Sequence, residues 1–384
     1  MSIEARREYL EAIRERYQKA SRREKTLILN EYCEVCEYDR KYAIKVLNRP
    51  IQERQNRPGP KPKYDAEVIK NLVELWRQMD QMCSKNMKMA LPEWLPHFKG
   101  IDERVRSLLL EISPSTIDRA LKPYRNVFKR GLSATKPSLI KNRIPIELMD
   151  KAITEPGFME GDTVAHCGNT LVGEFINSLT MTDILSSWTE NRALLGKTSE
   201  VVIGALKSIE KELPFPLSGV ATDGGSEFIN DDVYFYFTRR AKPVKPVRRR
   251  PYKKNDNAHV EQKNWTHVRE IFGYERLESK ELLDLMNDIY QNYWNPLKNY
   301  FTPSMKLIEK TRIGGKLKKK YDKPKTPYHR LMEHPNVSPW AKARMQSQYQ
   351  KLNPFELKQE LERKLNFFFR LVEIEKRKRS QTGS

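Results

Sequence analysis

The sequence has 384 residues, which is longer than one ordinary domain and predicts two to four structural units. Hydrophobic residues make up 38% of the chain and aromatic residues 10%, which is enough to build cores and excludes a wholly disordered protein. The 71 Lys and Arg against 50 Asp and Glu give a formal net charge of +21. Such a charge favours a polyanionic partner, nucleic acid first and a membrane surface as the competing possibility.

Membrane insertion is not expected from this sequence. The N-terminal residues lack the apolar core of a signal peptide, and no apolar stretch approaches the roughly 20 residues that span a bilayer. The four cysteines are too few for a disulfide scaffold, so we expect a cytoplasmic protein. Cys33 and Cys36 form a C-x-x-C pair without a second pair of ligands nearby, and we interpret them as apolar residues on one helical face.

The sequence pattern of residues 1–48 predicts a helical unit that binds DNA. The segment 4–20 has a helical apolar stripe, and Ser21 followed by Glu24 is the pattern of a capping box for a second helix. A short break at 37–39 leads into a third helix that carries Arg40, Lys41 and Lys45. Two helices joined by a tight break, the second of them basic, have the outline of a helix-turn-helix.

The basic, proline-rich segment 49–64 is a predicted linker, either an arm lying in a minor groove or a solvated spacer. Residues 65–126 predict a second helical or helix-turn-helix unit for DNA. The prolines in 89–98 are expected to interrupt its helices, and Ser115 three residues before Asp118 predicts another capping box. Arg119 and Lys122 would face outward. Residues 127–150 are again a predicted linker.

The hydrophobic period changes in the region 151–310. Three consecutive strands are expected within 157–194, followed by a helix at 198–213, a strand at 217–222, a helix at 231–241, a strand or extended loop at 242–252 and a helix at 257–273. This order predicts an α/β core with a mixed five-stranded sheet and helices. The basic region 311–384 is expected to be helical, with a flexible linker at 316–325 and a terminal helix from about 353.

Three acidic residues lie where a regular backbone would hold them firmly. Asp162 lies in the first predicted strand, Asp223 ends the strand after the long helix, and Glu261 lies on the helix of 257–273. Taken singly, each has an ordinary interpretation: a turn acid, a turn before two glycines, or a solvated helix charge. Together they are a carboxylate set at strand ends without Cys or His ligands, which suits Mg²⁺ or Mn²⁺.

The stretches "TDGGSEF" and "NDNAHVEQKNW", together with Asp162, resemble the catalytic core of DDE transposases and retroviral-type integrases, which has an RNase H-like fold. There are 37 residues between Asp223 and Glu261, close to the family's spacing. Gly224 stands where the family usually has Asn. The resemblance covers about 155–300, and the two helical units ahead of it look like the end-binding region of bacterial insertion-sequence transposases.

This resemblance implies an enzyme that acts on double-stranded DNA, both the element ends and the target. Asp162, Asp223 and Glu261 would be the catalytic residues and the ligands of two Mg²⁺ ions, for which Mn²⁺ can substitute. Water would release a 3′-OH at the element end, and that 3′-OH would attack target DNA by in-line phosphoryl transfer. The family also implies a homo-oligomer on DNA in a prokaryotic, nucleoid-associated setting.

Further residues are expected to support the triad or hold DNA. Glu227 and Phe228 are interpreted as a brace behind Asp223, and His259 and His267 as DNA or packing contacts rather than metal ligands. DNA contacts are also predicted near the third acid, at Arg248, Arg249, Arg250, Lys253, Lys254, Asn257 and Lys263.

Two other functions remain open. One is a non-enzymatic DNA-binding regulator derived from a transposase, and the other is a metal-dependent nuclease without strand transfer.

Overall fold

The computed structural model of the protein describes residues 3–49, 63–125, 153–222, 225, 227–248, 263–313 and 316–382. The chain divides into two compact units, Met1–Lys63 and Tyr64–Ser384. The predicted linkers 49–64 and 127–150 therefore lie largely outside the described residues, as do Asp223 and Glu261. No helix within the described ranges is long and apolar enough to cross a membrane.

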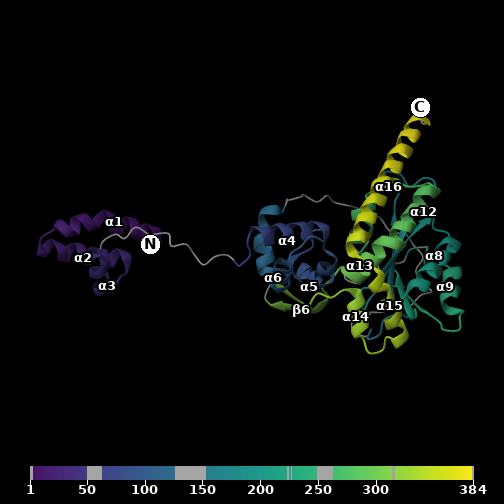
Figure 1. Ribbon diagram of the computed structural model, residues 1–384, viewed down its shortest axis with the longest axis horizontal. Coiled ribbons are helices and arrows are strands. Elements are labelled where there is room, and N and C mark those ends of the chain that lie inside the picture. Colours follow the sequence, from purple (N-terminus) through teal and green to yellow (C-terminus); the bar gives the residue numbers. More distant parts are fainter. Residues whose placement is uncertain are drawn as a thin grey trace. The chain divides into compact units, whose positions relative to one another are not determined.

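The first unit consists of three helices, α1 (Ile3–Lys19), α2 (Arg22–Cys36) and α3 (Arg40–Asn48) (Figure 1). Ser21 caps α2 and its backbone N–H donates to the Glu24 carboxylate at 2.8 Å, as the sequence predicts. The three helices enclose their own small core, formed by Ile13, Tyr17, Ile28, Leu29, Tyr32, Cys36, Ala43 and Leu47.

The turn between α2 and α3 is fixed by a left-handed residue and a helix cap. Glu37 ends α2 in the left-handed region with φ of 55°, and Asp39 caps α3 by accepting from the Lys41 N–H at 2.9 Å. Cys36 is buried and Cys33 half-buried on α2, in agreement with their interpretation as apolar residues of a helix.

The second unit begins with a helical region, and two of its details differ from the sequence prediction. Pro92 lies inside α5 instead of interrupting it. The cap of α7 is Ser113, whose hydroxyl accepts from the Thr116 N–H at 3.2 Å, because Pro114 takes the first helical position and moves the start two residues ahead of Ser115. The elements are α4 (Ala66–Gln78), α5 (Ser84–Trp94), η1 (Leu95–His97), α6 (Glu103–Glu111), α7 (Pro114–Leu121) and η2 (Lys122–Tyr124).

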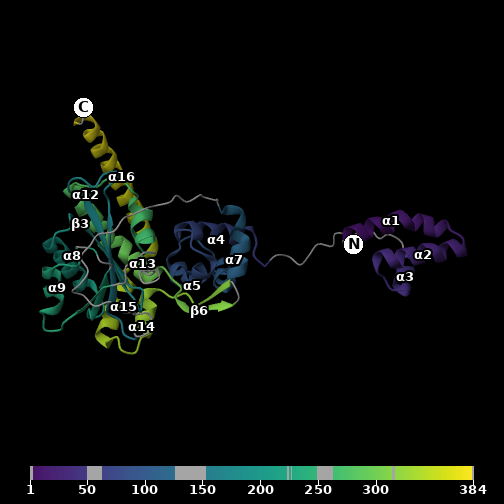
Figure 2. The ribbon, with the colours of Figure 1, turned by 180° about the vertical axis from the view of Figure 1, so that it is seen from behind.

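A five-stranded mixed sheet with helices follows in this unit, as predicted, and Figure 2 shows its strand β3 beside α8 and α12. The strand order is β3-β2-β1-β4-β5; β1, β2 and β3 are antiparallel neighbours, whereas β4 runs parallel to both β1 and β5. The strands are β1 (Phe158–Ala165), β2 (Ile176–Asp183), β3 (Thr189–Leu195), β4 (Gly219–Thr222) and β5 (Lys245–Arg248).

Helices pack on this sheet at both of its edge strands, β3 and β5. Both α8 and α12 contact β3, and α9 packs against α8 and β5. The described helices following β3 are α8 (Ser199–Glu212), α9 (Asp231–Thr238), the π-helix η3 (Asn264–Arg269), α11 (Glu270–Phe272), α12 (Lys280–Ile289), the π-helix η4 (Tyr290–Trp294) and α13 (Asn295–Phe301).

The region after α13 contradicts one expectation. Residues 316–325 are not a flexible linker: Lys316–Tyr321 form β7, which pairs antiparallel with β6 (Leu307–Ile313). The many charged residues of this segment gave no strand signal, although its partner strand β6 lies directly before it in the sequence. Three helices follow, α14 (Pro327–Glu333), α15 (Pro339–Lys351) and the terminal helix α16 (Pro354–Thr382).

The helices α4–α7 share one continuous hydrophobic core with the sheet and the C-terminal helices. The Trp94 indole on α5 donates to the Phe301 carbonyl at the end of α13, with an N–O distance of 3.2 Å. Glu93 on the same helix contacts Tyr349 and lies 3.4 Å from the His329 ring nitrogen. The helical region is thereby fixed to the sheet.

A buried polar cluster joins β3 to the helices behind it. The Glu190 carboxylate lies 3.3 Å from the Arg192 guanidinium, and both side chains are almost completely buried. Glu190 also accepts hydrogen bonds from Trp188 at 3.0 Å and from Asn295 at 2.9 Å. Burial raises the pKa of Glu190, and these donors oppose that shift.

Candidate functional site

Asp162 lies on β1, the central strand of the sheet. It is half-buried and lies opposite Thr180 of β2. One carboxylate oxygen accepts from the Thr163 N–H at 2.8 Å, and the other accepts from the Asn264 side-chain amide at 2.5 Å. The helical segment that begins at Lys263 thus holds this carboxylate in one orientation.

The register between β1 and β4 brings a second chain segment to the same strand end. Gly161 lies opposite Thr222, the last residue of β4, and Thr222 in turn lies opposite Arg248 of β5. β4 and β5 thus end level with Gly161, whereas β1 continues past them to Ala165. Asp162 follows Gly161 on β1, directly beyond the last residue that pairs with β4.

Thr163, the neighbour of Asp162, is tied to the segment that follows β4. Its hydroxyl donates to Glu227 at 2.5 Å, and the Lys197 ammonium contacts Glu227 at 2.8 Å and the Thr163 hydroxyl at 2.9 Å. Burial would raise the pKa of Glu227, but the hydrogen bonds from Lys197 and Thr163 outweigh it and hold the pKa below its usual range. Glu227 is therefore an anionic brace.

Phe228 completes this brace from the core side. It is buried, and its N–H donates to the Gly225 carbonyl at 3.1 Å. The predicted brace behind Asp223 stays a prediction, because Asp223 lies outside the described residues. Two supporting residues, Lys197 and Asn264, were missed by sequence reasoning. Asn264 lies one helical turn after Glu261 in the sequence, a spacing that could have marked it, whereas nothing in the local pattern singles out Lys197.

Lys263 and His267 face the interior. The Lys263 ammonium lies 3.3 Å from the His267 ring, whose other nitrogen lies 3.4 Å from the Asn191 amide oxygen. Burial, together with the charges of Lys298, Lys306 and Arg330, lowers the pKa of Lys263 to about 8. Burial also holds the pKa of His267 well below its ordinary value, so this ring is neutral and packed.

The other predicted DNA contacts fall into three groups. Arg40, Lys41 and Lys45 are exposed on α3, and Arg119 and Lys122 are exposed at α7 and just beyond it. Arg248 is buried at the end of β5. The remaining predicted residues lie outside the described part of the chain: Asp223, Arg249, Arg250, Lys253, Lys254, Asn257, His259 and Glu261.

Within the described ranges, no three His, Cys, Asp or Glu side chains form a group that could hold a metal ion. Two of the three predicted ligands, Asp223 and Glu261, are outside those ranges.

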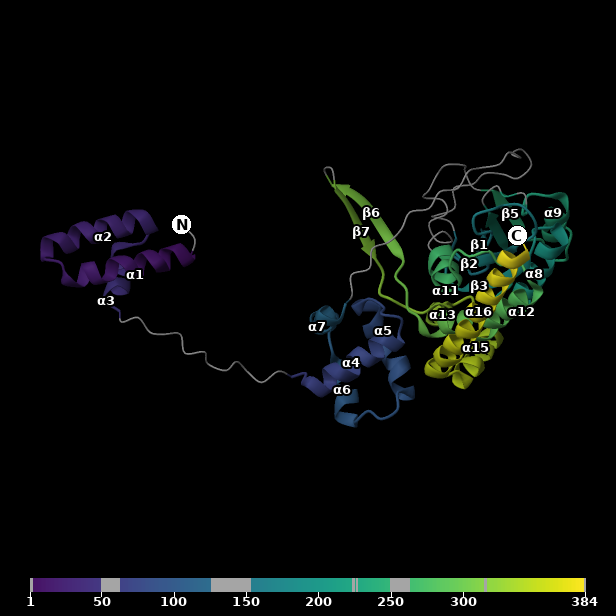
Figure 3. The same ribbon diagram turned by 90° about the horizontal axis from the view of Figure 1, so that it is seen from above.

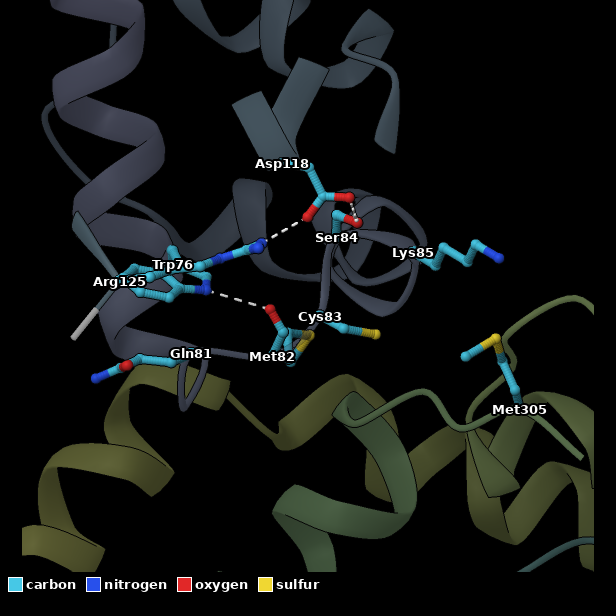
Figure 4. A pocket seen from close by; sticks show the side chains of 9 residues that line it. All are labelled: Trp76, Gln81, Met82, Cys83, Ser84, Lys85, Asp118, Arg125 and Met305. Carbon is cyan, nitrogen blue, oxygen red and sulfur yellow. Dashed lines mark hydrogen bonds and ion pairs between the residues drawn. The ribbon is translucent and has the colours of Figure 1, made fainter. Parts of the chain in front are cut away.

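A separate pocket lies between the helical region and the segment before β6. Its volume is about 560 Å³, and Trp76, Cys83, Lys85 and Met305 are among its lining residues. The Asp118 carboxylate accepts from the Ser84 hydroxyl at 2.9 Å and from Arg125 at 2.6 Å (Figure 4). These bonds hold the pKa of Asp118 below its ordinary value, with Arg125 the larger cause. Asp118, Ser84 and Arg125 are thus bound to one another in the lining of the pocket.

Comparison with known proteins gives one clear relationship. No family model matches the chain. The chain is similar to the uncharacterized protein y4rM of Sinorhizobium fredii (strain NBRC 101917 / NGR234), with 37% identity over 341 residues, which cover 86% of this chain and 96% of that protein. Identity at this level over nearly the whole of both chains makes them homologues with one architecture. The chain belongs to the same family as y4rM.

Proposed function

We propose that this chain is a DNA transposase of the DDE class with an RNase H-like core. The observation that carries the proposal is the register of the parallel strands β1 and β4, in which Gly161 lies opposite Thr222. In the sequence, Asp162 directly follows Gly161 and Asp223 directly follows Thr222. Consecutive α-carbons are about 3.8 Å apart, so the register supports neighbouring positions for these two aspartates.

The sheet supports the same fold. An antiparallel meander of three strands, followed by two strands parallel to the first, is compatible with an RNase H-like core. The 37 residues between Asp223 and Glu261 leave room for α9 and β5 before the chain returns to the segment of Asn264, which contacts Asp162. This return supports the assignment of Glu261 to the same strand edge.

Asp162, Asp223 and Glu261 would hold two Mg²⁺ ions, which supply charge neutralisation at the scissile phosphate. The held orientation of Asp162 fits this use, because a ligand oxygen must not be free to rotate away. Glu227, fixed by Lys197 and Thr163, keeps the loop after β4 against β1. The basic surfaces would position the DNA, since phosphoryl transfer depends chiefly on positioning and electrostatics.

The test is an end-joining assay on labelled duplexes that carry the DNA flanking the gene. We expect 3′-end cleavage and joining with Mg²⁺ or Mn²⁺ and none with a chelator. Asp162→Asn is expected to lower both products by at least about 10²-fold, because the metal ligand is lost. The control Asp232→Asn removes an exposed acid of α9 and should leave both products unchanged.

Each other outcome selects another function. Cleavage without joining by the wild type would identify a nuclease. DNA binding without either product would identify a non-enzymatic regulator. Full activity of Asp162→Asn would refute the metal assignment.

A further inference from the structure

The β6–β7 hairpin is a strongly basic segment of the second unit. Between residues 306 and 321 there is a single acidic residue, Glu309, among seven basic ones: Lys306, Lys310, Arg312, Lys316, Lys318, Lys319 and Lys320. The side chains of Lys318, Lys319 and Lys320 are exposed on β7. Figure 3 shows the two strands extending away from α13 and α15.

The three lysines have no acidic partner among the described residues. Glu309 lies opposite Lys320 in the ladder, yet its carboxylate accepts from the Thr311 hydroxyl at 3.0 Å instead of forming an ion pair. Thr311 lies opposite Lys318. Three consecutive lysines without counter-charges among the described residues are suited to an external polyanion.

The base of the hairpin is firmly anchored, so the strands are presented in a fixed direction. The Lys306 N–H donates to the Asp322 carboxylate at 2.6 Å, and the Asp322 N–H donates back to the Lys306 carbonyl at 2.9 Å. Arg330 on α14 binds the same carboxylate at 2.5 Å and the Ser304 carbonyl at 2.7 Å. The Lys306 ammonium contacts the carbonyls of Ile184 and Leu185, next to the sheet.

Next to this anchor, described apolar side chains of the ribbon are exposed. Leu307 is 44% exposed, Ile308 62% and Tyr321 47%. A two-stranded ribbon exposed on both faces is marginally stable by itself, so a ligand that covers it is expected. Side chains alternate along a strand, which sets Lys318 and Lys320 on one face and Lys319 with Tyr321 on the other.

This alternation distinguishes between the possible partners. A membrane would require one apolar face and one basic face, whereas both faces of this ribbon carry lysine. A second copy of the chain, with its net charge of +21, would be repelled. Duplex DNA offers phosphates on both sides of its major groove, which is about 12 Å wide and admits a two-stranded β-ribbon.

We propose that the β6–β7 hairpin is a DNA-binding ribbon that grips the phosphates of a duplex through Lys318, Lys319 and Lys320. The inference rests on the proposed function only in taking DNA as the partner. It assigns a contact separate from the helix-turn-helix units and from the acidic triad.

The experiment measures the affinity of the full-length chain for a fluorescent DNA duplex across a salt series. The triple variant Lys318→Gln, Lys319→Gln, Lys320→Gln is expected to lower affinity at least about 30-fold near 0.1 M salt. Its log–log salt slope should be smaller in magnitude by about 2 to 3, since each phosphate contact contributes close to one. The control variant Lys211→Gln, Lys280→Gln, Lys351→Gln removes the same charge from exposed sites on α8, α12 and α15 and should change the slope by less than about 1.

Three results would overturn the inference. The first is an unchanged slope in the hairpin variant, and the second is an equal change in the control. The third is wild-type binding to anionic lipid vesicles that the hairpin variant loses while DNA binding persists. A wild type that binds through the hairpin but neither cuts nor joins would refute the transposase while the ribbon stands.

Discussion

The two helix pairs that the sequence predicts as DNA-binding motifs have different structural settings. The pair α2–α3 belongs to a unit with its own small core, whereas α6–α7 is part of the core that also contains the sheet. The same sequence pattern thus occurs once in a self-contained module and once in a wall of a larger unit.

Trp94→Ala should have the largest effect. The side chain is buried, and its indole bonds to Phe301, so its loss removes both core packing and the connection between α5 and α13. We expect the free energy of unfolding of the second unit to fall by about 3–5 kcal/mol, measured by denaturant titration. Trp340→Ala removes a tryptophan that is 71% exposed and should change it by less than about 0.5 kcal/mol. Equal effects would contradict the shared core.

Leu47→Ala should destabilise the first unit alone. Leu47 is fully buried in the three-helix core, and such truncations cost about 2–5 kcal/mol. In calorimetry we expect the transition of the first unit to shift down or disappear while that of the second unit is unchanged. The exposed Leu27 on α2 supplies the matched control, Leu27→Ala. A shift of both transitions would show that the two units unfold together.

Ser113→Ala tests the cap of α7. Loss of the hydroxyl that accepts from the Thr116 N–H is expected to cost about 1 kcal/mol of the unfolding free energy of the second unit. Ser115→Ala, at the position that the sequence pattern favoured, should cost less than about 0.5 kcal/mol because that residue is exposed inside the first turn. A larger loss of unfolding free energy for Ser115→Ala than for Ser113→Ala would instead support Ser115 as the cap.

The smallest effect concerns pH. The pKa of Asp118 is lowered in the folded state, chiefly by Arg125 and then by Ser84, so its stabilisation is present above the unfolded pKa of about 3.9 and is lost as pH falls through the lower folded value. Because Asp118 is half exposed, we expect less than about 1 kcal/mol. The difference in denaturant midpoint between wild type and Asp118→Asn should shrink below about pH 4. If that difference grew on acidification, the pKa of Asp118 would be raised in the folded state instead of lowered.

The sequence predicted the mixed sheet and most helices because periodicity and punctuation are local properties. It failed where contacts outside the segment itself decide. Lys316–Tyr321 is a strand because β6 pairs with it, and Pro92 is tolerated within α5 because the helix is held in the core. For the site, the position of Asp162 in the first strand of the sheet followed from pattern. Lys197 could not be found, because a long helix separates it from Glu227 in the chain.

The buried cluster around Glu190 has a consequence for how this family can diverge. Replacing Arg192 or Asn295 singly would strand a carboxylate away from water, whereas replacing the whole set by apolar residues would remove the need for any of them. Related chains should therefore retain these residues together or lose them together. Positions on β3 and α13, which are far apart in the sequence, would then change together among related chains.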